Sequence, residues 1–190
     1  MKIGLLGGSF NPVHNGHLAI SQAAYTALGL DAVWFLPTGN HPLKRGEELW
    51  PYSLRKNLLQ KALTPFPHFV LSELDANPTN PSFTSNLIES LQHSHPADIF
   101  YFIIGYDIVP DLPRWHRFPW LITHTHFAVF TRPGFDPDSL KALPYARHLR
   151  FFAMPPIHIS STDIRQALKR GEAVAHLLPP GVADAIQQGR

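Results

Sequence analysis

The sequence predicts an α/β fold of the Rossmann-like, doubly wound type: a mostly parallel sheet with helices on both faces. Short runs that are apolar throughout alternate along the chain with segments whose apolar residues recur at helical spacing. This alternation is typical of βαβ units, and continuous apolar runs indicate strands that are buried on both faces. The 190 residues can bury a sizeable core and show no repeat or linker, so we expect one domain over residues 1–190.

The individual elements follow from hydrophobic periodicity and from glycine and proline breaks. The expected strands cover residues 2–8, 31–39, 68–74, 98–105, 126–134 and 149–156. The expected helices cover residues 16–28, 53–63, 82–92, 161–169 and 181–188. Gly29 and Gly171 stand where the first and fourth of these helices should stop. The order of the strands in the sheet does not follow from these patterns.

The composition excludes several classes of protein. The net charge is +2 and Lys and Arg are scattered, which suits anionic small molecules and argues against a nucleic-acid partner. The longest strongly apolar run, residues 99–104, is too short to span a bilayer, and the first residues do not resemble a signal peptide, so we expect no membrane partner. The chain contains no cysteine, which removes thiolate chemistry and fits a cytoplasmic location. The sequence leaves open whether the chain forms homo-oligomers.

The residues with chemically useful side chains follow the expected strands at their carboxyl ends. The string GGSFNPVHNGH (7–17) follows the first strand, Lys44 the second, GYD (105–107) the fourth and HISSTDIR (158–165) the last. Ligands of open α/β sheets bind in the crevice beyond the carboxyl ends of the strands. We therefore expect these separate motifs to meet at one edge of the sheet.

The first motif has the features of an anion-binding turn. Its glycines allow the backbone to turn tightly and approach a ligand, and the helix that follows offers unpaired N–H groups. His14 and His17 are three residues apart, so both imidazoles can face one site and donate to phosphoryl oxygens. The string is neither a P-loop nor the usual dinucleotide fingerprint. The alternative interpretation is a strand-to-helix turn with incidental histidines.

The second motif opens a helix with a cation in its first turn. Ser160 and Asp163 have the spacing of a capping box, and the alternative interpretation of the motif is simply a well-capped helix. Arg165, however, faces the positive end of the helix dipole, at a cost of roughly 0.3–1 kcal/mol. A bound polyphosphate would reverse the sign of that interaction.

Together, HNGH (14–17) and ISSTDIR (159–165) resemble the paired motifs of the HxGH nucleotidyltransferase superfamily. Within it the chain is similar to the bacterial nicotinate-nucleotide adenylyltransferase family almost from end to end, through PSFT (81–84), GYDIVPDLPRW (105–115) and LLPPGVADAI (177–186). Three positions depart from the family pattern. Asn11 replaces the usual aspartate, Leu43 stands where the loop after the second strand usually has histidine, and Asn86 follows Ser85 where many relatives have Asp-Thr.

The resemblance implies transfer of AMP from ATP to the 5′-phosphate of nicotinate mononucleotide, giving deamido-NAD and pyrophosphate. Mg²⁺ would enter bound to the ATP phosphates, and no metal site made by the protein is expected. The resemblance also assigns roles to residues. His14, His17, Lys44 and Arg165 would contact the triphosphate as catalytic residues. The ATP-binding residues would be Gly7, Gly8, Ser9, Phe10, Gly16, Gly105, Asp107, Ser160, Ser161 and Thr162. Trp115 would stack on the pyridine ring, and Thr84 with backbone N–H groups near Ser85 and His116 would hold its carboxylate.

Several alternatives stand beside this interpretation. The acceptor could be nicotinamide mononucleotide, the chain could be a sister enzyme such as phosphopantetheine adenylyltransferase, or it could be a catalytically silent nucleotide-binding protein. Individual side chains also have plainer explanations: Trp115 as core, Thr84 as an ordinary first-turn residue, Asp107 as a cap and Lys44 as a solvated charge. Arg55, early in the second expected helix, is another candidate contact, although we expect it at the surface. We expect the pairs His93 with His95 and His124 with His126 to be structural or surface residues.

Overall fold

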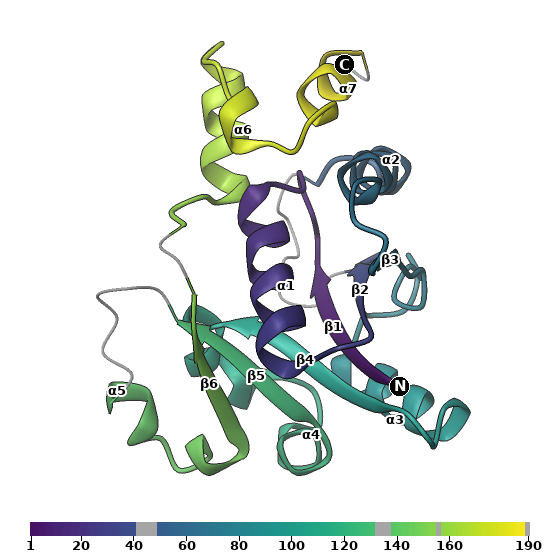
Figure 1. Ribbon diagram of the computed structural model, residues 1–190, viewed down its shortest axis with the longest axis vertical. Coiled ribbons are helices and arrows are strands. Elements are labelled where there is room, and N and C mark those ends of the chain that lie inside the picture. Colours follow the sequence, from purple (N-terminus) through teal and green to yellow (C-terminus); the bar gives the residue numbers. More distant parts are fainter. Residues whose placement is uncertain (41–48, 132–137, 155–156, 189–190) are drawn as a thin grey trace.

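Six strands form a single sheet in the computed structural model, which describes residues 1–40, 49–131, 138–154 and 157–188 (Figure 1). Every pair of neighbouring strands in this sheet is parallel, and their order is β3-β2-β1-β4-β5-β6. The strands are β1 (Lys2–Gly8), β2 (Ala32–Pro37), β3 (Phe69–Leu71), β4 (Ile99–Gly105), β5 (His126–Thr131) and β6 (Leu149–Ala153). The predicted doubly wound fold is thus confirmed, and the strand order is the one typical of Rossmann-like sheets.

The direction of winding reverses between β1 and β4, and this is where a ligand crevice opens in such sheets. β1 pairs with β2 on one side, with Gly8 opposite Pro37, and with β4 on the other side. β4 in turn ends at Gly105, which pairs with Phe130 of β5. The glycine-rich end of β1 and the glycine at the end of β4 therefore lie at the same edge.

Helices cover both faces of the sheet. Their bounds are α1 (Asn15–Leu28), α2 (Tyr52–Leu63), α3 (Thr84–Ser94), α4 (Phe118–His124), α5 (Asp138–Lys141), α6 (Ser161–Lys169) and α7 (Val182–Gln188). The described residues also include three 3₁₀ segments: η1 (Tyr106–Arg114), η2 (Ala146–His148) and η3 (Ala175–Leu177). One buried cluster contains residues of α1, α2, α6 and α7, and a second contains residues of α3, η1 and α4. In the part of the chain that the structure describes, no helix is both long and apolar enough to cross a bilayer.

Gly29 and Gly171 have φ values of +59° and +74°, so both predicted helix stops adopt the left-handed conformation that ends a helix.

The sequence analysis missed α4 and most of η1. The prolines at 110 and 113 interrupt the helical pattern there, although a 3₁₀ segment with proline spacing of three tolerates them. The strand expected over 68–74 is shorter than predicted. It ends at Leu71, because the chain then turns into the loop that carries Asp75 toward Gly39.

Gly39 allows two loops to pass each other closely at the carboxyl edge of the sheet. Its N–H donates to the carbonyl of Asp75 at 2.9 Å. A Cβ atom at this position would overlap the main-chain carbonyl group of Ala76, which cannot rotate away as a flexible side chain could. The close approach of these loops therefore requires glycine.

We predict that Gly39→Ala lowers the free energy of unfolding by about 1–3 kcal/mol, because the backbone must shift to relieve the overlap. Urea unfolding followed by circular dichroism measures this. The matched control is Gly171→Ala, where nothing lies within 4 Å of the added Cβ and only the positive φ opposes the change. A Gly39→Ala protein with the urea midpoint of the wild type would contradict the prediction.

Candidate active site

The loop between β1 and α1 is held in an unusual backbone conformation. Phe10 has a φ of +44°, a region that bulky side chains rarely adopt, and it is only 1% exposed. Its ring packs on Phe35 with ring centroids 5.8 Å apart and meets His17 edge-on at 5.0 Å. Packing of the Phe10 ring therefore fixes the strained backbone next to the imidazoles, as is common at functional sites.

The two histidines of HNGH form one unit at the start of α1. His14 is the N-cap residue, and its backbone N–H donates to Nδ1 of His17 at 3.2 Å. Because Nδ1 of His17 accepts this hydrogen bond, the neutral imidazole carries its hydrogen on Nε2 and presents a donor there. The two ring centroids are 3.7 Å apart. The spacing of three residues thus places two imidazoles side by side at the positive end of a helix.

Gly16 makes room for this arrangement. A Cβ atom on residue 16 would lie 2.9 Å from Nδ1 and 3.0 Å from Cε1 of His14. A side chain at residue 16 would therefore displace the His14 ring, which explains why glycine lies between the two histidines.

The late motif packs directly on the early one. Arg165 on α6 donates from Nη1 to the carbonyl of Asn11 at 2.8 Å, and the Ser161 hydroxyl donates to the carbonyl of Pro12 at 2.9 Å. The second Arg165 nitrogen, Nη2, lies 3.4 Å from the hydroxyl of Thr162. In Figure 1 the start of α6 lies against the start of α1. Arg165 and Asn11, 154 residues apart in the sequence, are therefore in contact, and the two motifs meet at the loop between β1 and α1.

Ser160 caps α6 as predicted. Its hydroxyl accepts from the backbone N–H of Asp163 at 3.1 Å and donates to the carboxylate of Asp163 at 2.7 Å.

Lys44 and Leu43 lie outside the described residues, so the structure does not place the predicted lysine contact.

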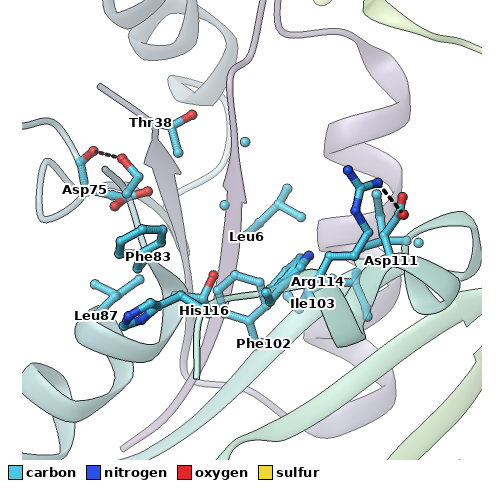
Figure 2. A pocket seen from close by; sticks show the side chains of 18 residues that line it. Leu6, Thr38, Asp75, Phe83, Leu87, Phe102, Ile103, Asp111, Arg114 and His116 are labelled. Carbon is cyan, nitrogen blue, oxygen red and sulfur yellow. Dashed lines mark hydrogen bonds and ion pairs between the residues drawn. The ribbon is translucent and has the colours of Figure 1, made fainter. Parts of the chain in front are cut away.

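A cavity of about 410 Å³ opens beside this loop, across the carboxyl ends of β1 and β4 (Figure 2). Its lining includes six of the predicted site residues: Gly7, Gly8, Thr84, Gly105, Trp115 and His116. Figure 2 shows Asp75 and Phe83 on one side of the cavity and the Asp111–Arg114 ion pair, 3.0 Å long, on the opposite side. The cavity thus lies at the point where the sheet reverses its winding, as expected for a nucleotide crevice.

Thr84, Trp115 and His116, three of the four predicted pyridine-binding residues, line this cavity. The Trp115 ring meets Phe102 edge-on, with centroids 5.9 Å apart, so Trp115 is at once part of the core and part of the wall. Thr84 is the first residue of α3 and also lines the cavity. The fully buried hydroxyl of Ser85 lies 2.9 Å from Nδ1 of His116, whose ring stacks on Phe83 at 4.3 Å. Ser85 therefore supports His116 rather than lining the cavity itself.

Asp107 lies at the start of η1, exposed and directly beside Gly105. The Asp107 carboxylate occupies the space that a Cβ atom on Gly105 would need, so the side chain of Asp107 lies directly over the end of β4. Among the residues that the structure describes, no group of three His, Cys, Asp or Glu side chains is arranged to hold a metal ion.

The expectation that Arg55 lies at the surface is wrong. Arg55 is 2% exposed, because its guanidinium finds three main-chain carbonyls inside the protein. The sequence contains a pattern that indicates the burial of Arg55: Leu58, Leu59 and Ala62 follow it at the spacing of one helix face, and all three are buried.

Asp75 is a second residue that the sequence analysis missed, because it lies in an irregular loop without a recognisable motif.

The comparisons with known proteins agree with this geometry. A fold with both motifs at the switch point defines a nucleotidyltransferase, and the family model described as cytidylyltransferase-like matches residues 5–167, which contain both motifs. The chain is 37% identical to a protein of Bacteroides thetaiotaomicron, and the match covers 99% of this chain and 92% of that protein. It is 36% identical to a protein of Exiguobacterium sibiricum, and that match covers 99% of this chain and 97% of that protein. Both carry the name "probable nicotinate-nucleotide adenylyltransferase". The chain belongs to the nicotinate-nucleotide adenylyltransferase family.

The fold has a solved counterpart. The structure titled Plasmodium falciparum nicotinic acid mononucleotide adenylyltransferase complexed with NaAD superimposes with a TM-score of 0.84 over 99% of this chain and 95% of that one. Its sequence is 20% identical, so this likeness concerns the fold.

We predict that Asp75→Asn stabilises the protein at neutral pH. Burial raises the pKa of the Asp75 carboxyl to about 6, against a smaller opposing contribution from Ser82. When folding raises the pKa of a carboxyl, its protonated form stabilises the folded state. This stabilisation is lost as the pH rises from about 4 to 6 and the carboxyl ionises. Asparagine does not titrate, so the melting temperature of the variant relative to wild type should rise through this window and stay level above it.

Thermal unfolding between pH 4 and 8 tests this prediction, with the exposed Asp184→Asn on α7 as the control. A difference in melting temperature that does not change with pH would contradict it.

Proposed function

We propose that the chain transfers AMP from ATP to the 5′-phosphate of nicotinate mononucleotide, giving deamido-NAD and pyrophosphate in NAD biosynthesis. The observation that carries this proposal is the docking of α6 on the β1–α1 loop through Arg165 and Ser161, which unites the two motifs beside a cavity at the switch point. The names of the relatives support the choice of acceptor. The reaction would occur in the cytoplasm, which the cysteine-free sequence fits.

The reaction needs positioning and charge stabilisation more than acid–base chemistry. An oxygen of the mononucleotide 5′-phosphate attacks the α-phosphorus of ATP and forms a new P–O bond. The bond from that phosphorus to the oxygen bridging the β-phosphate breaks, and pyrophosphate leaves. The attacking phosphate is already anionic at neutral pH, so no side chain has to remove a proton. This agrees with a site built of donors rather than of nucleophiles.

The donors of the site have distinct parts in this scheme. Nε2–H of His17 and the positive end of α1 would stabilise the negative charge that develops on the triphosphate. Arg165 holds the loop through Asn11, and its positive charge would act on the same phosphates. ATP would enter as its magnesium complex, in which the ion reduces the charge of the phosphates. We expect the phosphates and water to supply the ligands of the ion.

The cavity fits a flat aromatic ring better than a flexible chain. Trp115, Phe83 and the His116 ring supply aromatic surfaces, and the hydroxyl of Thr84 supplies a polar group for a ring substituent. These features favour a pyridine mononucleotide over the acceptor of phosphopantetheine adenylyltransferase. Nicotinamide mononucleotide is the second candidate, because the Asp75 carboxyl in the cavity wall would repel a nicotinate carboxylate but not an amide.

We predict that His17→Ala lowers kcat by about 10²–10³-fold while ATP still binds, because a donor to the reacting phosphates is lost and the rest of the site remains. Pyrophosphate release is measured with Mg-ATP and each of the two mononucleotides, and ATP binding by calorimetry. His93→Ala, at an exposed position of α3, is the control. Unchanged turnover in His17→Ala would remove this residue from the mechanism, and a wild type inactive with both acceptors would support the silent nucleotide-binding alternative.

We predict that Thr84→Val raises the KM for nicotinate mononucleotide by about 10-fold, the effect of one lost hydrogen bond to a carboxylate. The substitution keeps the shape of the side chain, so the KM for ATP should stay the same. Steady-state kinetics with each substrate varied in turn measure both values, and Thr26→Val at an exposed position of α1 is the control. Equal effects on both KM values would show that Thr84 does not contact the pyridine nucleotide.

A further inference from the structure

Within the described part of the chain, the buried cation Arg55 donates its hydrogen bonds to main-chain carbonyls. Its Nε donates to the carbonyl of Trp50 at 3.0 Å, Nη1 to the carbonyl of Ser9 at 2.6 Å and Nη2 to the carbonyl of Thr38 at 3.1 Å. Its guanidinium carbon also lies 5.3 Å from the centre of the Tyr52 ring. The three carbonyls come from three separate segments: the loop after β1, the end of β2 and the start of α2.

Packing alone does not explain a guanidinium at this position. The neighbours of Arg55 on the same face of α2 are leucines and alanine, and an apolar side chain would be buried there without loss of hydration. The ion pairs among the described residues do not include Arg55, and burial lowers the pKa of its guanidinium. A buried charge without an opposite charge is costly unless its hydrogen bonds are satisfied. The three carbonyls satisfy the hydrogen bonds of the Arg55 guanidinium. We therefore look for the role of Arg55 in the three segments that carry these carbonyls.

The carbonyl of Ser9 links Arg55 to the loop between β1 and α1. Across a trans peptide bond the carbonyl and the following N–H point in opposite directions. Because the Ser9 carbonyl points to Arg55, the N–H of Phe10 points away from it, and Phe10 is the residue with the positive φ. The guanidinium therefore determines which way this peptide faces.

The same guanidinium is connected to the loop by a second route. The carbonyl of Trp50 accepts from Arg55, and the N–H of Trp50 donates to Oδ1 of Asn11 at 3.0 Å. The carbonyl of Asn11 in turn accepts from Arg165. Two guanidinium groups on different helices thus hold the loop from either side of Phe10.

We propose, on the basis of the proposed adenylyl transfer, that Arg55 is a positioning residue for that reaction. It holds the carbonyls of Ser9, Thr38 and Trp50, and so fixes the backbone that presents His14 and His17 to the phosphates. A lysine cannot replace it, because one ammonium group does not reach three carbonyls that require the planar fork of arginine.

The test compares Arg55→Lys and Arg55→Ala with wild type below their melting temperatures. We expect kcat to fall by about 10–100-fold in Arg55→Lys, with both KM values changed by less than about three-fold, because misplaced groups weaken the transition state more than ground-state binding. We also expect millimolar guanidinium to restore part of the turnover of Arg55→Ala by occupying the vacated site. Guanidinium should not stimulate wild type or His17→Ala. The control on the same helix is Lys61→Met, which removes an exposed cation.

The outcomes separate this proposal from the proposed function. An active wild type whose Arg55→Lys variant keeps the wild-type kcat overturns the positioning role and leaves the function intact. Loss of stability without loss of turnover per folded molecule, or no rescue of a folded Arg55→Ala protein by guanidinium, also overturns it. A wild type inactive with both mononucleotides overturns the proposed function and this proposal with it. Arg55→Lys keeps the charge and most of the volume, so it decides the question where Arg55→Ala fails to fold.

Discussion

Three carbonyl groups of the loop between β1 and α1 point to donors inside the protein, and the rest of the site depends on that orientation. Ser9 is held by Arg55, Asn11 by Arg165 and Pro12 by Ser161. A carbonyl oxygen directed into a phosphate site would repel its ligand, whereas a backbone N–H would attract it. The donors come from α2 and α6, far apart in the sequence, so the loop takes its shape only when both helices have packed on it.

The conformation of the loop between β1 and α1 depends on the packing of its side chains as well. The glycines at the end of β1 permit a tight turn, but the strained φ of Phe10 persists only because its ring is buried against Phe35 and His17. The imidazole of His17 is then oriented by the N–H of His14, and the His14 ring occupies the space left by Gly16. Tertiary packing thus determines a local conformation that the loop sequence alone would not favour.

Most of the fold could be predicted from the sequence, because buried parallel strands and amphipathic helices leave local patterns. The order of the strands could not, since pairing depends on contacts between distant segments. The prolines of η1 concealed a helical segment that forms part of the cavity wall. Arg55 was misplaced because charge usually indicates solvent, although the apolar residues three, four and seven positions later indicated a buried face. Asp75 reaches the cavity through the contact of its loop with Gly39, for which no local pattern exists.

The departure at Asn11 from the family's usual aspartate is compatible with this architecture. Asn11 is 1% exposed, and its side-chain oxygen accepts the N–H of Trp50. An amide oxygen serves as acceptor as well as a carboxylate oxygen does, and burying a neutral amide costs less than burying a charge. A carboxylate here would also stand beside Arg165, whose charge it would partly neutralise. Asparagine keeps the hydrogen bond that connects the loop to the segment before α2, and it leaves the positive charge of Arg165 undiminished.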